Sequence, residues 1–100
     1  MLIKENHVAA VGGVAAAIRT ARAGVGHLVK IEVEVDSLDQ LDEALSERVD
    51  AVLLDNMGPA MLAEAMRRIA GRAIAEASGR ITPATAPAIA ASGVDLISAG

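Results

Sequence analysis

The sequence predicts an α/β fold in which about five parallel strands alternate with four helices. Strand and helix patterns follow one another along the chain in repeats of roughly 20–25 residues. Positions 31–36 alternate apolar and acidic residues, as a strand with one buried face does. Positions 51–54 are continuously apolar, which is typical of a strand covered on both faces. Strands that alternate with helices pair in parallel through right-handed crossovers, and the 100 residues fit a single domain.

The chain begins with a short strand and a helix. The apolar pair at positions 2–3 ends the first strand. The alanine-rich stretch 14–22 favours a helix and carries an apolar stripe at helical spacing. Glycines at 12–13 are a poor helix interior and mark its start, whereas Gly24 and Gly26 mark its end.

Two further strand–helix pairs occupy the middle of the chain. A strand at 30–35 is followed by Ser37, which begins a capping box and a helix with leucines at helical spacing. A strand at 49–54 is followed by Pro59, which suits the first position of a third helix. The predicted buried face of this third helix consists of Met61, Leu62, Ala65, Met66 and Ile69.

The last third of the chain repeats this order. A fourth strand is predicted at 73–77. Pro83 and Pro87 compete for the start of the fourth helix, and we place its regular part near Pro87. Gly93 ends that helix, and a fifth strand covers 94–98.

Composition excludes several classes of function. The chain contains no aromatic residue to stack on nucleic-acid bases, and its net charge of −4 disfavours binding to a phosphate backbone. It contains no cysteine, which excludes disulfides and zinc–thiolate sites. No stretch approaches the ~18 consecutive apolar residues of a membrane span. The N-terminus lacks a signal-peptide pattern, so we expect a soluble, cytoplasmic chain.

Polar residues and glycines follow the predicted strands, where ligands bind in parallel α/β sheets. Lys4 can neutralise a carboxylate or a phosphate. Glu34 and Asp55 can accept hydrogen bonds from sugar hydroxyls, or hold Mg²⁺ directly or through water. Gly79 and Gly100 allow backbone N–H groups to approach a phosphate closely. The sequence therefore predicts a site for a phosphorylated sugar and an anionic co-substrate.

Each of these residues also has a purely structural interpretation. Lys4 can be a solvated charge, and Glu32 and Glu34 can form the wet face of an edge strand. We select Glu34 because Glu32 lies deeper. Asp55 with its following amide can form an Asx turn, and glycines after strands are often simple turns. We interpret His7 as a turn or cap residue, and no Ser-His-Asp spacing, zinc pattern, P-loop or GxGxxG is present.

Five short blocks of sequence, in order and at consistent spacing, carry a resemblance that covers essentially the whole chain. They are Leu2-Ile-Lys-Glu-Asn-His7 with Gly12-Gly13, Ile31-Glu-Val-Glu-Val35, Leu53-Leu-Asp-Asn56, Glu76-Ala-Ser-Gly79 and Gly93-Val-Asp-Leu-Ile-Ser-Ala-Gly100. Each block alone is weak, but five in register are specific. Together they resemble quinolinate phosphoribosyltransferase, also called nicotinate-nucleotide pyrophosphorylase (carboxylating).

The resemblance implies a partial parallel (βα) barrel and a pentosyltransferase of NAD biosynthesis. The family converts quinolinate and phosphoribosyl pyrophosphate to nicotinate mononucleotide, pyrophosphate and CO₂, with Mg²⁺, as a dimer or larger oligomer. By motif, Lys4 meets anionic groups of the substrate, and Glu34 and Asp55 hold ribose hydroxyls or the metal. The implied cradle for the 5′-phosphate consists of Ser78, Gly79, Ala99 and Gly100.

The chain departs from the family pattern in three respects. Arg80 stands where the family usually has glycine, and Pro87 is unexpected. The last block usually continues, whereas here the sequence ends at Gly100. The length is about a third of a family member, so we expect residues 1–100 to be one barrel segment, without the family's N-terminal domain and early barrel strands. We expect this segment to be inactive alone and to self-associate.

Two other functions stay open at this level. One is a family paralogue that acts on another pyridine or sugar-phosphate substrate. The other is a non-catalytic α/β scaffold or oligomerisation segment. Binding of phosphoribosyl pyrophosphate with Mg²⁺, lost in Glu34→Ala and Asp55→Ala, distinguishes a retained half-site from a scaffold.

Overall fold

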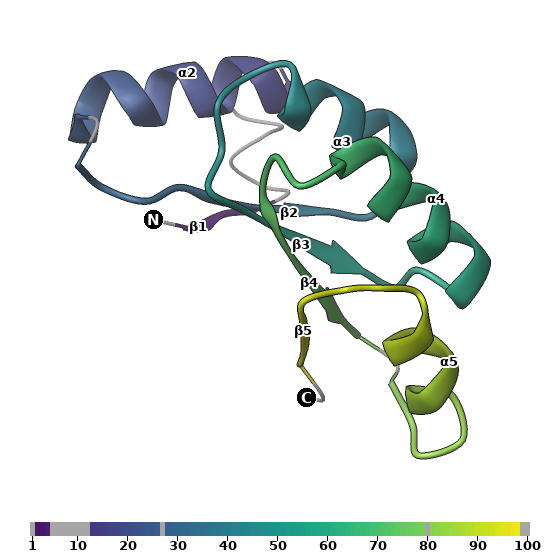
Figure 1. Cartoon of the computed structure of the whole chain (residues 1–100). Coiled ribbons are helices and arrows are strands. Elements are labelled where there is room, and N and C mark those ends of the chain that lie inside the picture. The colour runs from purple at the N-terminus through teal and green to yellow at the C-terminus, as the bar shows by residue number, and fades with distance from the viewer. Residues whose placement is uncertain (1, 5–12, 27, 80, 99–100) are drawn as a thin grey trace.

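The computed structural model describes residues 2–4, 13–26, 28–79 and 81–98. In chain order the elements are β1 (Leu2–Ile3), α2 (Val14–Val25), β2 (Glu32–Val35), α3 (Leu38–Leu45), β3 (Ala51–Asp55), α4 (Pro59–Ile69), β4 (Ile74–Ser78), α5 (Ala86–Ala91) and β5 (Leu96–Ser98) (Figure 1). The five strands form one sheet in the order β1-β2-β3-β4-β5, and every neighbouring pair is parallel. The predicted alternation of five strands with four helices is confirmed.

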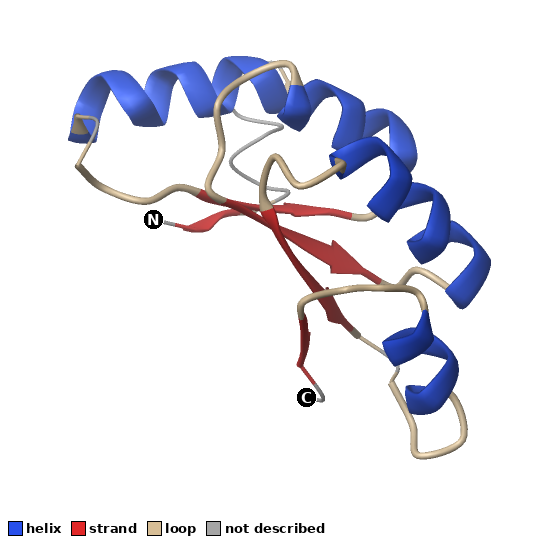
Figure 2. Ribbon diagram, viewed as in Figure 1, coloured by secondary structure: helices blue, strands red, loops and turns tan. Residues whose placement is uncertain are grey.

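The four helices cover one face of the twisted sheet, as Figure 2 shows. Each strand lies beside the strand that precedes it in sequence, so every helix connects two adjacent parallel strands. This is the arrangement of consecutive units in a (βα) barrel. No element of the described residues covers the second face of the sheet, which we call the open face.

The hydrophobic core lies between the sheet and the helices. Val33 and Val35 of β2 are fully buried, whereas Glu32 and Glu34 are half-buried on the open face, as their alternation predicts. The other large side chains that are fully buried are Val14, Ile18, Ile31, Leu41, Val52, Leu54, Leu62 and Ile69. The core therefore consists of aliphatic side chains that the two periodicities place on facing surfaces.

Strand β3 corrects one prediction. Its continuous apolar run indicates burial on both faces, but only Val52 and Leu54 are buried. Ala51 and Leu53 point to the open face and remain half-buried. The run is apolar on both sides, but the described part of this chain supplies a cover for only one of them.

Hydrogen bonds explain where two helices begin. At α3, Ser37 Oγ accepts from the Gln40 N–H at 3.1 Å, and Gln40 Oε1 accepts from the Asp36 N–H at 2.9 Å, which confirms the predicted cap. At α2, the acceptor comes from another helix, because Glu43 Oε2 accepts from the Val14 N–H at 3.1 Å. This second cap links α3 to α2 and is not a local sequence pattern.

Two predicted details differ in the structure, and a third is confirmed. Gly24 lies inside α2, and the helix ends only at Val25, with Gly26 as its cap at φ 77°. Met61 of α4 is 39% exposed, because it lies away from the side of the helix that Leu62, Ala65 and Ile69 bury. The fourth helix begins at Ala86, next to Pro87, as predicted. Among the described residues no helix is long and apolar enough to cross a membrane.

Candidate functional site

The carboxyl ends of β3, β4 and β5 align in one row. Asp55 pairs with Ser78, and Ser78 pairs with Ser98, as neighbours across the parallel sheet. Side chains alternate along each strand, and the preceding residues Leu54 and Ala77 are buried under the helices. Asp55, Ser78 and Ser98 therefore share the open face at the carboxyl edge of the sheet.

A second row lies one layer deeper on the open face. Glu34 pairs with Leu53, Leu53 with Glu76, and Glu76 with Leu96. Lys4 directly follows Ile3, and the partner of Ile3 is Val33, so Lys4 lies level with Glu34. The deeper row thus runs from a cation through two carboxylates, and Glu34 is one layer below Asp55 on a neighbouring strand.

The turn after β3 is locked to the turn after β4. Ser78 Oγ donates a hydrogen bond to Asp55 Oδ1 at 3.2 Å. The Asn56 N–H donates to the Ser78 carbonyl oxygen at 3.0 Å, and Asn56 Nδ2 lies 3.5 Å from Asp55 Oδ2. Asn56 adopts φ 56°, a left-handed conformation that asparagine tolerates better than most residues. These contacts fix the Asp55 carboxylate at the rim of the open face.

Gly79 completes this corner for a steric reason. Its φ is 74°, and a Cβ added there would lie 2.5 Å from both Asp55 Oδ1 and Asn56 Oδ1. The sequence interpretation of Gly79 was a close approach of the backbone to a phosphate. The structure shows a close approach of Gly79 to Asp55 and Asn56. This packing alone requires a glycine, whether or not a ligand binds.

The described site residues meet at one edge of one face. Asp55, Ser78 and Gly79 are in direct contact, and Lys4 and Glu34 occupy the layer beneath them. The remaining residues on which sequence predictions rest lie outside the described residues: His7, Arg80, Ala99 and Gly100.

Sequence reasoning left three residues of this face unselected. They are Asn56, Glu76 and Ser98. Glu76 stands two positions before Ser78, and residues at this spacing lie on the same face of a strand. That spacing could have identified Glu76 as a residue of the open face. The sequence groups Asn56 with Asp55 at the end of the strand and favours a functional role for the pair over an Asx turn, but only Asp55 is selected as a site residue. Ser98 had no local signal, because its place depends on the pairing of β5 with β4.

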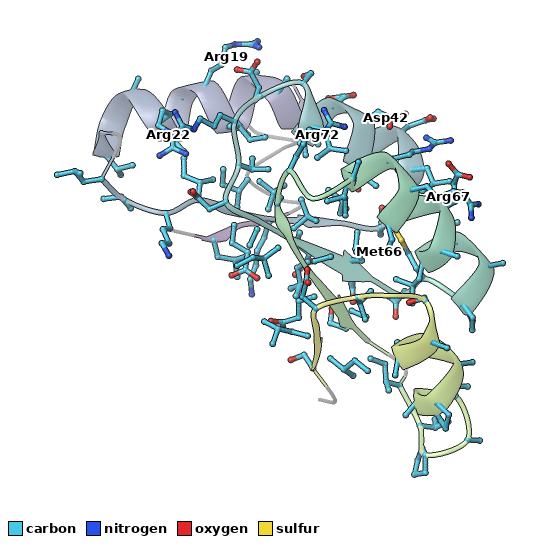
Figure 3. All side chains as sticks on the ribbon, viewed as in Figure 1. Arg19, Arg22, Asp42, Met66, Arg67 and Arg72 are labelled. Atoms are coloured by element: carbon cyan, nitrogen blue, oxygen red, sulfur yellow. The ribbon has the colours of Figure 1, made fainter. Side chains whose placement is uncertain are left out.

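The open face is acidic, and the arginines of the helix layer lie elsewhere. Figure 3 shows the labelled Arg19, Arg22 and Arg67 on the helix side of the sheet. Two surface hollows, of ≈ 370 Å³ and ≈ 500 Å³, are lined by Arg48 among others, and they lie at the amino ends of the strands. The polar row at the carboxyl edge is therefore separate from both hollows.

The described residues contain no group of three or more His, Cys, Asp or Glu side chains arranged to hold a metal ion. Glu34 and Asp55 supply only carboxylate oxygens, which are the ligands that Mg²⁺ prefers. The two carboxylates belong to different layers of the open face.

Comparison with known proteins gives a consistent result. The family model for the quinolinate phosphoribosyl transferase C-terminal domain matches residues 1–100. The chain is 38% identical over 100 residues to a probable nicotinate-nucleotide pyrophosphorylase [carboxylating] of Bacillus subtilis. This match covers all of the chain and 35% of that protein. It is 38% identical over 103 residues to the human nicotinate-nucleotide pyrophosphorylase [carboxylating], again covering 35% of it.

Solved structures agree with these relatives. The nicotinate-nucleotide pyrophosphorylase from Ehrlichia chaffeensis superposes with a TM-score of 0.94 at 36% identity, over 99% of this chain and 36% of that one. The enzyme of the same name from Francisella tularensis gives a TM-score of 0.91 at 39% identity, over 99% of this chain and 35% of that one. The chain thus spans about a third of the length of its relatives. It belongs to the quinolinate phosphoribosyltransferase family, and what it matches there is the C-terminal domain.

Proposed function

We propose that the protein to which this segment belongs converts quinolinate and phosphoribosyl pyrophosphate to nicotinate mononucleotide, pyrophosphate and CO₂. The observation that carries the proposal is the corner of Asp55, Ser78 and Gly79 above the layer of Lys4 and Glu34, in a chain that matches the family's C-terminal domain throughout. The relatives carry the name of this carboxylating enzyme.

The acidic rim suits the charge that develops in such a reaction. The pyridine nitrogen forms a bond to the anomeric carbon of the ribose while the bond from that carbon to pyrophosphate breaks. The ribose ring then has oxocarbenium character, and the carboxylates of Glu34 and Asp55 stabilise positive charge there. In the nucleotide adduct the bond between the pyridine ring and one carboxylate then breaks, CO₂ leaves, and the ring carbon takes up a proton from solvent. No protein nucleophile is required, in agreement with the absence of a Ser-His-Asp pattern in the sequence.

The other predicted residues hold the anionic groups of the substrates. Lys4 is an exposed cation level with Glu34 and neutralises a carboxylate or phosphate of the substrate. Ser78 and Gly79 cradle the 5′-phosphate. The sequence prediction adds Ala99 and Gly100 to this cradle. Glu34 and Asp55 are the residues that would hold Mg²⁺, which would supply positive charge to the pyrophosphate.

The same proposal places the enzyme in the cytoplasm and makes it a homo-oligomer. The 100-residue chain spans about a third of its relatives, so we expect it to bind part of the substrate without turning it over. The alternatives are a paralogue that uses a different pyridine or sugar phosphate and a scaffold without a substrate. A specific binding signal at Glu34 and Asp55 favours an enzyme over a scaffold.

Calorimetric titration tests the proposed half-site. We expect phosphoribosyl pyrophosphate with Mg²⁺ to bind the 100-residue chain, and binding to be lost in Glu34→Ala and Asp55→Ala. Ser46→Ala, which changes an exposed hydroxyl at the end of α3, is the matched control and retains binding. Absence of binding in the unsubstituted chain supports the scaffold, and turnover of quinolinate by the isolated chain would contradict the expected inactivity.

A further inference from the structure

The side chain of Asn56 lies beside the carboxylate on which the proposed chemistry depends. Asp55 Oδ1 accepts a hydrogen bond from Ser78 Oγ at 3.2 Å, and Asp55 Oδ2 faces Asn56 Nδ2 at 3.5 Å. The two oxygens thus have different donors, one from β4 and one from the turn after β3. A carboxylate held on both oxygens has less rotational freedom than one held on a single oxygen.

The backbone of Asn56 makes a hydrogen bond of its own. Its N–H donates to the Ser78 carbonyl at 3.0 Å, which ties the turn to the end of β4. Its φ of 56° places the residue that follows Asp55 in the left-handed region. A left-handed φ costs most residues about 1–2 kcal/mol, and asparagine tolerates it better than others. Both the conformation and the amide therefore favour asparagine at this position.

Gly79 provides the space that the Asn56 amide occupies. A Cβ at Gly79 would lie 2.5 Å from Asn56 Oδ1 and 3.2 Å from its Cγ. The same Cβ would also lie 2.5 Å from Asp55 Oδ1, so the missing side chain at Gly79 leaves room for the amide and the carboxylate together. The rest of the Asn56 side chain is exposed, and its Nδ2 lies 3.5 Å from Asp55 Oδ2, at the outer limit of a hydrogen bond.

We propose that Asn56 is a positioning residue for this reaction: its amide, packed against Gly79, sets the orientation of the Asp55 carboxylate toward the ribose. The inference rests on the proposed function, in which Asp55 stabilises positive charge on the sugar. Asn56 itself touches the carboxylate and not the reacting atoms. Contacts of this kind are often long in the absence of substrate and shorten when substrate is bound.

The kinetic test uses a full-length chimaera, in which residues 1–100 of this chain replace the matching 35% of the Bacillus subtilis relative. Three variants separate the roles of Asn56. Asn56→Gly keeps access to the left-handed φ but removes the amide, Asn56→Ala removes both, and Asn56→Asp keeps the shape but adds a carboxylate. Ser46→Ala, in the remote end of α3, is the control with unchanged activity.

We expect Asn56→Gly and Asn56→Ala to lower kcat by about 10- to 100-fold, the scale of a small misplacement of a reacting group. The KM for phosphoribosyl pyrophosphate should change less than about twofold, because substrate binding is not the step affected. Asn56→Asp should lower kcat as well, because it replaces the amide donor with a carboxylate that cannot donate to Asp55. Wild-type kcat in Asn56→Gly or in Asn56→Asp would overturn the role of the amide.

A second measurement does not depend on activity. Three-bond couplings to the Asp55 Cγ report its χ1 rotamer in the 100-residue chain. We expect one rotamer in the unsubstituted chain and rotamer averaging in Asn56→Gly. A single, unchanged rotamer in Asn56→Gly contradicts positioning, whatever the reaction. An inactive chimaera with the expected averaging rejects the proposed function and leaves the positioning of Asp55 supported.

Discussion

Asp50 and Asp95 make the same two-way contact at the amino ends of β3 and β5. The Asp50 N–H donates to the Ile31 carbonyl at 2.9 Å, and Asp50 Oδ2 accepts from the Ile31 N–H at 2.6 Å. Asp95 repeats both bonds with Ala75, at 2.9 Å and 2.8 Å. Each aspartate thus joins the start of its own strand to the preceding strand, at the edge opposite the candidate site. This edge contributes to stability, not to chemistry.

The first prediction concerns Asp50 and pH. The hydrogen bond from the Ile31 N–H, together with Arg22, holds the pKa of the Asp50 carboxyl below its ordinary value. A lowered folded-state pKa means that Asp50 stabilises the fold above about pH 4, and that this contribution is lost as the pH falls through the folded-state value. We expect Asp50→Asn to lower the free energy of unfolding at pH 7 by about 1 kcal/mol. The effect is modest because the Asp50 side chain is 38% exposed.

Urea titrations at several pH values check this prediction. The difference between Asp50→Asn and the unsubstituted chain should shrink below about pH 4, where the wild-type carboxyl is protonated as well. Asp36→Asn, at an exposed position, is the control and should stay within about 0.5 kcal/mol at every pH. A difference that does not depend on pH would show that the charge of Asp50 has no part in its effect.

The second prediction separates the two reasons for glycine at position 79. Gly71 and Gly79 have similar φ values of 81° and 74°, but an added Cβ meets nothing within 4 Å at Gly71. Gly71→Ala should therefore cost only the conformational strain, about 1–2 kcal/mol. Gly79→Ala should cost at least about 1 kcal/mol more, because it also displaces Asp55 and Asn56. Equal shifts of the urea midpoint in Gly71→Ala and Gly79→Ala would show that Asp55 and Asn56 move aside without loss of stability.

At the scale of elements, local patterns predicted every helix and strand of the described chain, but not all their ends. The strand predicted from position 30 begins at Glu32, because the Ile31 backbone pairs with Asp50 before the regular ladder starts. Gly24 ended the predicted helix too early, since one exposed glycine does not stop a helix that is packed on its other side. Ends that depend on a partner distant in sequence leave no local signal.

The candidate site was predictable to the same extent. The rule that ligands bind at the carboxyl ends of parallel strands identified Asp55 and Ser78, and the structure brings them into contact. It did not show that Glu34 lies one layer below Asp55, since strand register is set by pairs some twenty residues apart. For the same reason Ser98 was not selected, although it shares the rim with Asp55.

The third prediction concerns the cap that α3 provides for α2. Glu43 is the acceptor for the Val14 N–H at 3.1 Å, and its charge lies at the positive end of the α2 dipole. We expect Glu43→Ala to lower the free energy of unfolding by about 1 kcal/mol, and Glu43→Gln, which keeps an acceptor, to lower it less. Glu47→Ala removes only the 3.6 Å surface ion pair with Arg19 and should have almost no effect. Thermal denaturation measures the loss of stability in each variant. A larger drop in Tm for Glu47→Ala than for Glu43→Ala would contradict the inter-helix cap.

For the molecule as a whole, the open face of the sheet combines two opposing properties. Leu2, Ile74 and Leu96 are 36%, 51% and 53% exposed there, although a parallel sheet is normally covered on both faces. The same face carries the carboxylates of Glu34 and Glu76. Apolar contact favours association of two such faces, while like charges oppose it. The chain spans about a third of the length of its relatives.

The last prediction follows from this balance. We expect the 100-residue chain to self-associate through its open face, and to do so more strongly at high salt, because salt screens the carboxylates and leaves the apolar contact in place. Light scattering at about 0.05 M and 1 M NaCl should show a mass that rises with salt. Ile74→Glu should reduce the mass at both salt concentrations. Leu28→Glu, which changes a leucine that is 87% exposed before β2, is the matched control and should leave it unchanged. A mass of one chain at both concentrations, or equal effects of the two substitutions, would show that the open face does not drive association.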